Sequence, residues 1–169
     1  MRTAGDRADG NGGGRATGDL WPGADEAGAA FGGTKAILSV GGRLVLLRRD
    51  DDPAIPHPGL VDLPGGGREG DETPVACTLR EVSEEVGLAL PPSRLSWGRP
   101  YSSSDGRGRS WLFAAGIDED EAAALTLGDE GQALWLEPVE TYLERDDAVP
   151  GHQARVRDWW GGGSGRGVG

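Results

Sequence analysis

The sequence predicts an α/β domain, and three features of the chain support this prediction. Two apolar segments at residues 34–40 and 43–49 flank a Gly-Gly pair, which is typical of a β-hairpin. A segment with helical periodicity follows at residues 74–86. Two further strand patterns, at 94–102 and 109–117, come after it. We therefore expect a sheet covered by helices.

The length of 169 residues suits one domain with a single core. Glycine is unusually common, with 31 residues concentrated at both ends. Residues 1–33 contain few apolar groups, so we expect a disordered tail. We assign residues 34–160 to the domain and residues 161–169 to a second flexible tail.

The hairpin is expected to turn at its Gly-Gly pair and to end at Arg48 and Arg49. Either arginine could meet a phosphate, or both could end in solvent. The proline-rich loop that follows carries three aspartates, Asp50 to Asp52, and His57, all expected to be solvated. The segment LVDLP at 60–64 is expected to form a short strand before a glycine-rich loop.

The helix at 74–86 has clear start and stop signals. Thr73 supplies a capping hydroxyl, Pro74 suits the first turn, and Gly87 suits the end. One apolar stripe is formed by Val75, Leu79, Val82 and Val86. This pattern predicts a helix packed against the sheet.

Three glutamates share a second face of this helix, Glu81, Glu84 and Glu85. Like charges at these spacings weaken a helix by about a few tenths of a kcal/mol per pair. On their own they would indicate a solvated face. Carboxylate oxygens are also the ligands that Mg²⁺ and Mn²⁺ prefer, so a divalent metal site is the alternative.

After the second pair of strands the chain predicts a loop, a strand and two closing helices. Four aromatic residues in those strands are expected in the core or a pocket wall: Trp97, Tyr101, Trp111 and Phe113. The acidic run DEDEAAA is expected to be a solvated loop. A Trp-containing strand follows the segment GDEGQ, and residues 137–144 and 151–160 are expected to form the amphipathic helices.

Charge and hydropathy restrict the partners and the compartment. A net charge of −11 and a pI near 4.6 argue against duplex nucleic acid. No apolar stretch approaches the length needed to span a bilayer, and no apolar run follows Arg2. One cysteine excludes an intramolecular disulfide framework. We expect a cytoplasmic protein without a membrane partner.

The fixed positions between residues 66 and 88 resemble the signature of the Nudix hydrolase family. The matching residues are Gly66, Glu72, Arg80, Glu81, Val82, Glu84, Glu85, Gly87 and Leu88. The resemblance is tight in this box and extends over about residues 34–160. It implies a mixed, curved sheet between helices. It also implies hydrolysis of the phosphoanhydride in a nucleoside diphosphate derivative, with Mg²⁺ or Mn²⁺ as cofactor.

The resemblance also implies roles for individual residues. Glu84 and Glu85 should bind metal, and Glu81 should be a further ligand or the group that deprotonates water. The backbone carbonyl of Gly65 should complete the ligand set. Arg80 and Glu72 should form a structural pair between loop and helix, with Gly66 and Gly87 as structural positions. Cys77 is expected to be a buried filler.

The segment GDEGQ resembles a region of MutT-type enzymes that carries an additional catalytic glutamate. This points to Glu130 as a ligand or base, with Asp129 as the alternative. MutT-type enzymes place an asparagine at the start of the last helix, where this chain has His152 and Gln153. These two residues, with Arg48, Arg49 and Leu63, are the candidate substrate contacts.

The leading substrate is a nucleoside triphosphate cleaved to monophosphate and pyrophosphate. The alternatives are ADP-ribose, a nucleotide sugar or a dinucleoside polyphosphate. Some Nudix domains only bind a nucleotide and serve as sensors, and Nudix homodimers are common. A sensor would leave every nucleotide intact.

Overall fold

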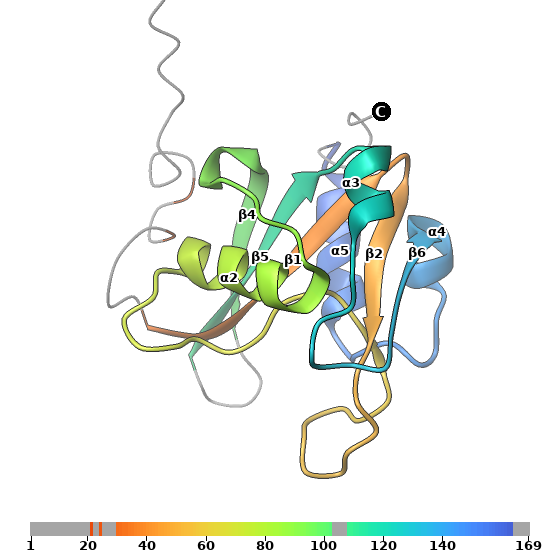
Figure 1. Cartoon of the computed structure of the whole chain (residues 1–169). Helices are drawn as coiled ribbons and strands as arrows, with labels where there is room; N and C mark the ends of the chain where they lie inside the picture. Colours follow the sequence, from red (N-terminus) through yellow and green to blue (C-terminus); the bar gives the residue numbers. More distant parts are fainter. Residues whose placement is uncertain (1–20, 22–23, 25–29, 103–107, 164–169) are drawn as a thin grey trace, which may run out of the picture.

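The computed structural model describes residues 21, 24, 30–102 and 108–163. Within this part of the chain, a mixed six-stranded sheet lies between helices (Figure 1). The strand order is β3-β2-β1-β5-β4. β1 pairs with the first residues of β2 and β3 with its last residues, whereas β6 pairs with β2 along its whole length. The strands are β1 (Phe31–Val40), β2 (Arg43–Arg48), β3 (Val61–Asp62), β4 (Leu95–Ser102), β5 (Arg109–Gly116) and β6 (Ala133–Pro138). The predicted α/β class is confirmed.

β1 pairs with β2 only near the turn, which leaves part of its edge for the glycine loop. β1 pairs with β2 next to the turn, at Ser39–Leu44 and Val40–Arg43, and runs parallel to β5 along its other edge. Farther along β1, the backbone of the glycine loop takes the free edge, because Ala36 N–H donates to the carbonyl of Pro64 at 2.8 Å. The loop is therefore held to the sheet by main-chain hydrogen bonds.

Helix α2 (Pro74–Val86) begins and ends as its sequence predicts. The hydroxyl of Thr73 accepts a hydrogen bond from the N–H of Ala76 at 3.1 Å. Gly87 ends the helix with φ of 69°, a left-handed conformation that glycine adopts without steric cost. The apolar stripe faces the sheet, since Val75, Val82 and Val86 are buried.

Alternating side chains of the strands fill two cores on opposite faces of the sheet. α2 covers one face, where Leu38, Val45 and Phe113 are buried. α5 (His152–Gly161) and the short α4 (Val139–Leu143) cover the other, with Ile37 and Trp159. Figure 1 shows α2 in front of the sheet and α5 behind it. Trp111 and Phe113 lie in the first core, and Trp97 and Tyr101 pack, partly buried, against the second.

The predicted start of the folded domain, residue 34, is too late. β1 begins at Phe31, so the folded part starts before residue 34. Trp21 also packs edge-on against Phe113, with ring centroids 5.7 Å apart, and the carbonyl of Ala24 accepts from Val75 N–H. Residues 1–20, 22–23 and 25–29 of the predicted tail lie outside the described residues.

The acidic run DEDEAAA is not a loop but contains α3 (Glu119–Ala124). Asp118 and Glu121 form a reciprocal capping box, which satisfies two N–H groups at the start of this helix. A short helical turn, η1 (Pro92–Arg94), precedes β4, and Arg94 pairs with Glu121 at 2.8 Å. The segment between β4 and β5 falls mostly outside the described residues. No helix in the described ranges has the length and apolar character needed to cross a membrane.

Candidate active site

Two glycines allow the loop after β3 to approach both the sheet and α2. Gly65 has φ of 128°, and a Cβ there would lie 2.3 Å from the carbonyl oxygen of Thr34. A Cβ on Gly66 would lie 2.7 Å from both carboxylate oxygens of Glu81. The N–H of Gly65 donates to Glu85 at 2.6 Å. The loop therefore contacts β1 on one side and the glutamates of α2 on the other.

The glutamates of α2 border a groove of about 730 Å³. Its acidic lining residues are Glu69, Glu81, Glu84, Glu85, Asp129 and Glu130. We call this cavity the acidic groove. The structure thus brings together the three box glutamates, Gly65 and both acidic residues of GDEGQ, although they come from three separate segments.

Burial sets the electrostatics of the groove. It raises the pKa of Glu85 to about 7, against the opposing effect of nearby Lys35. Burial also raises the pKa of Glu81, whose side chain is 12% exposed, and Arg80 partly offsets this. The side chain of Glu84 is 59% exposed.

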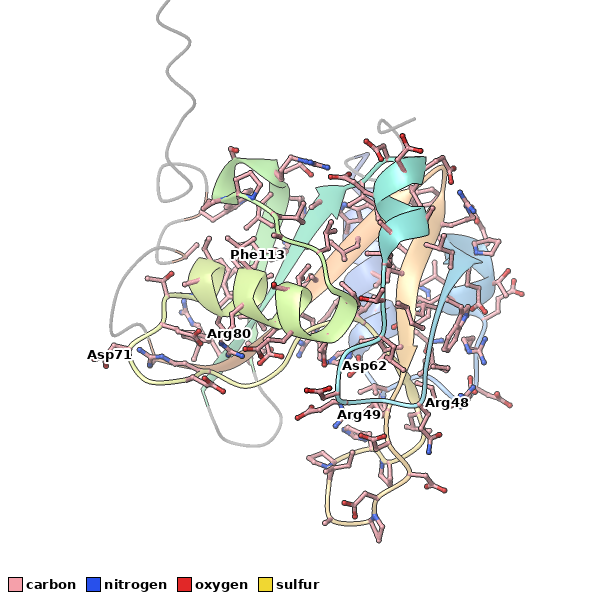
Figure 2. The ribbon with its side chains drawn as sticks, viewed as in Figure 1. Arg48, Arg49, Asp62, Asp71, Arg80 and Phe113 are labelled. Atoms are coloured by element: carbon pink, nitrogen blue, oxygen red, sulfur yellow. The ribbon has the colours of Figure 1, made fainter. Side chains whose placement is uncertain are left out.

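Arg80 links the loop to the helix (Figure 2). Its guanidinium donates to both carboxylate oxygens of Glu72, at 2.6 and 3.0 Å, and to the carbonyl of Gly67 at 2.9 Å. These bonds lower the pKa of Glu72. The same guanidinium donates to Glu81 and Glu84, each at 2.9 Å. The pair expected from the sequence is present, and it extends to two of the box glutamates.

Main-chain hydrogen bonds bring Glu130 to the groove. The N–H of Gly128 donates to the carbonyl of Glu85 at 2.9 Å. The N–H of Gly131 donates to Asp50 at 3.0 Å, so Asp50 is not the solvated charge that the sequence suggested. With both flanks fixed, Asp129 and Glu130 lie between them as exposed residues at the groove.

A buried charged cluster beside the loop was missed by the sequence analysis. Asp62 is 3% exposed and pairs with Lys35 at 2.8 Å and with Arg49 at 3.3 Å. His152 Nδ1 lies 2.7 Å from its second carboxylate oxygen. Burial alone would raise the pKa of Asp62, but Lys35 and His152 overcome this and hold it below the usual range. Lys35 also donates to the carbonyls of Leu63 and Gly65.

The remaining candidate contacts have different surroundings. Arg48 donates to the carbonyl of Gly59 at 2.8 Å and pairs with Asp147 at 3.2 Å. The amide nitrogen of Gln153 donates to the carbonyls of Tyr142 and Arg145, and Gln153 lines neither large cavity. Arg49 and His152, in contrast, line a second cavity of about 390 Å³. This cavity meets the acidic groove at Arg49 and the glycine loop.

The donor atoms fit a hard divalent cation, because they are all oxygens. Burial opposes the charged forms of Glu81 and Glu85, and a cation would favour them. Among the described residues, however, no three His, Cys, Asp or Glu side chains converge closely enough to hold a metal. Arg80 donates hydrogen bonds to Glu81 and Glu84, and Lys35 donates to the Gly65 carbonyl. These oxygens, which are expected to bind a metal, are therefore hydrogen-bonded to side-chain cations of the protein.

The buried Cys77 does not take part in the groove. Burial raises the pKa of its thiol to about 11, which disfavours the reactive thiolate. Its sulfur lies 3.6 Å from the hydroxyl of Thr34.

Three solved structures illustrate the similarity of the fold. A bifunctional NMN adenylyltransferase/ADP ribose pyrophosphatase from Francisella tularensis, complexed with AMP and a Mn ion, is 21% identical with a TM-score of 0.59. The match covers 85% of this chain but 44% of that protein, so this chain spans less than half its length. The MutT protein of Methanosarcina mazei Go1 is 20% identical with a TM-score of 0.60, covering 75% and 90% of the two chains. An Ap4A hydrolase from C. elegans is 14% identical with a TM-score of 0.61, covering 79% and 98%.

At these identities, the structural likeness establishes the fold alone. The NUDIX domain model matches the sequence over residues 33–159, which is most of the chain. The chain therefore belongs to the Nudix family.

Proposed function

We propose that the acidic groove hydrolyses the phosphoanhydride of a nucleoside diphosphate derivative with the help of Mg²⁺ or Mn²⁺. The supporting observation is that Glu81, Glu84, Glu85 and Glu130 line one groove with Gly65. Glu84, Glu85 and the Gly65 carbonyl would hold the metal, with Glu81 or Glu130 completing the set. Bound there, the metal would neutralise phosphate charge and make water more acidic.

Different side chains of this site would bind phosphate, orient the carboxylates and transfer the proton. An acidic groove repels a polyphosphate, and Arg49, which lines it, supplies one opposing charge. Arg80 holds Glu81 and Glu84 through its hydrogen bonds, which orients both carboxylates before substrate arrives. Glu130 is exposed on a tethered loop, and we assign it the removal of the proton from the attacking water. Glu81 is the alternative base.

Two substrate types remain candidates. The GDEGQ segment supports a nucleoside triphosphate that is cleaved to monophosphate and pyrophosphate. The cavity adjoining the groove supports a nucleotide with a second group beyond the anhydride, such as ADP-ribose, a nucleotide sugar or a dinucleoside polyphosphate. The similar solved structures include an ADP ribose pyrophosphatase and an Ap4A hydrolase, so we include ADP-ribose and Ap4A among the compounds to be tested.

A substrate panel tests this proposal. The full chain is incubated with Mg²⁺ or Mn²⁺ and each compound, and the products are identified by mass in ¹⁸O-labelled water. We expect at least one compound to yield a nucleoside monophosphate, and the label identifies the phosphorus that is attacked. If every nucleotide is bound but remains intact, the proposal is wrong and the chain acts as a sensor.

A further inference from the structure

The second cavity has the opposite charge to the acidic groove. It lies between the glycine loop, the start of β5 and the start of α5, and has a volume of about 390 Å³. Its cationic side chains are Lys35, Arg49, Arg109 and Arg155, joined by His57 and His152. We call it the basic cavity. Asp62 is the one carboxylate among its described lining residues, in a chain whose net charge is −11.

Two of these four cationic side chains form no ion pair with a carboxylate of the described residues. Lys35 is neutralised by Asp62 at 2.8 Å and donates to two carbonyls, so its hydrogen-bonding capacity is filled. Arg155 uses Nη1 for the hydroxyl of Ser110 at 2.9 Å, and no carboxylate of the described residues pairs with it. Arg109 is exposed at the start of β5 and likewise forms no ion pair with a described residue.

Arg155 is the strongest indication of an anion-binding site. Burial lowers the pKa of its guanidinium, so the charged form is disfavoured by its surroundings. It lies over the ring of Tyr101, 4.7 Å from the centroid, which fixes its position. A half-buried guanidinium held in this way is suited to a phosphate, which it can bind through two parallel hydrogen bonds.

His152 also lines the cavity, and its contact with Asp62 holds the ring in place. Its Nδ1 lies against the ionised carboxylate of Asp62, so Nδ1 carries a proton and donates it. In the described part of the chain, Nε2 has no partner.

We propose that the basic cavity binds a phosphate group of the substrate that is separate from the scissile anhydride. The substrate class is then a nucleoside diphosphate derivative with a further phosphate monoester or diphosphate. This inference rests on the proposed function, because the acidic groove must hold the anhydride that is cleaved. The two cavities meet at Arg49, so one ligand can reach both.

A purine base is a poorer occupant of this cavity. Bases are commonly held by stacking on aromatic rings, and none of the described lining residues is a Phe, Tyr or Trp. The ring of Tyr101 is already covered by Arg155. Four cationic side chains would also gain little from a neutral base.

A binding experiment without metal tests the cavity directly. Inorganic pyrophosphate is titrated into the metal-free full chain, and its affinity is measured by calorimetry and by the rise in melting temperature. Arg155→Gln and Arg109→Gln remove one cavity charge each, and Arg155→Lys keeps the charge. Arg99→Gln is the matched control, because Arg99 is an exposed cation of β4 that lines neither cavity.

We expect Arg155→Gln to weaken pyrophosphate binding at least about 10-fold, since hydrogen bonds to charged groups are the stronger ones. Arg155→Lys should retain more of the affinity than Arg155→Gln, and Arg99→Gln should match the wild type. Equal affinity in wild type and in Arg155→Gln/Arg109→Gln would overturn the proposal. So would tighter binding of adenosine or guanosine than of pyrophosphate.

Matched substrates provide the kinetic test. NADPH differs from NADH, and coenzyme A from dephospho-coenzyme A, by one phosphate monoester. We expect kcat/KM to favour the phosphorylated member of at least one pair, and Arg155→Gln to remove this preference. A wild-type ratio near one in both pairs would contradict the proposal. Failure of the proposed function is distinguishable, because it would abolish all turnover but leave pyrophosphate binding unchanged.

Discussion

Replacing Asp62 by asparagine should destabilise the protein strongly, because it removes the buried carboxylate that pairs with Lys35 and Arg49. Asp62 is 3% exposed, and its side chain pairs with Lys35 and His152, whose side chains are each 15% exposed. Removing one partner of a buried ion pair costs about 3–5 kcal/mol. Asparagine keeps the shape and one acceptor, which can still receive the 2.8 Å hydrogen bond from Leu63 N–H. We therefore expect a loss of about 3 kcal/mol, at the lower end of that range.

Urea unfolding followed by tryptophan fluorescence measures this change in unfolding free energy. For a domain of this size, the loss corresponds to a fall of about 10 °C in melting temperature. Lys35→Met and the double variant complete a double-mutant cycle, and the double variant should be less destabilised than the sum of the single changes. A loss below about 1 kcal/mol in Asp62→Asn would refute the buried-pair argument.

The effect of Asp62 should also depend on pH. Its pKa is lowered in the folded protein, so the pair contributes its full stability above the unfolded value of about 3.9. This contribution is lost as pH falls below that value and approaches the folded pKa. The difference between wild type and Asp62→Asn should accordingly be constant from pH 5 to 7 and shrink below about pH 4. A difference that grows on acidification would reverse the assigned sign.

The other predictions concern the acidic groove and the start of the chain. Glu84→Gln should abolish most activity at saturating Mg²⁺ and keep the fold, because the amide loses the ligand charge; activity within threefold of wild type would exclude the ligand role. Glu130→Gln should lower kcat at least 10-fold and change KM less than about fivefold, and an unchanged kcat from pH 7 to 9 would transfer the base role to Glu81. Deleting residues 1–20 should leave the melting temperature within about 2 °C of wild type. Deleting residues 1–33 should lower it by more than about 5 °C, since Phe31 is 6% exposed and begins β1; equal melting temperatures would show that this segment does not contribute.

The features that the sequence predicted are local ones. Thr73, Pro74 and Gly87 act within one or two turns of α2, so their positions alone define its ends. The Gly-Gly turn works in the same way, with φ of 51° and 74° at Gly41 and Gly42. The acidic run was misjudged although its signal was also local, because Asp118 and Glu121 have the spacing of a capping box.

What the sequence did not predict depends on contacts between distant segments. Lys35 and Asp62 lie 27 residues apart, in two strands that looked merely apolar. A charge inside such a strand pattern was nevertheless a usable signal, because buried Lys and Asp are rare unless paired. The start of β1 was missed for a different reason. Phe31, Gly32 and Gly33 resemble the preceding glycine-rich residues in composition, and the parallel pairing with β5 is what orders them.

The glycine loop lies between the acidic groove and the basic cavity, so one substrate can contact both. On one side it contacts Glu81 and Glu85, whose groove can hold phosphates only when cations offset the carboxylates. On the other side lies the basic cavity, which needs no metal to attract an anion. A ligand with phosphates at two places would therefore bind in one direction, with its metal-dependent anhydride in the acidic groove. The reversed orientation would place the anhydride beside Arg155, away from the glutamates that would hold the metal.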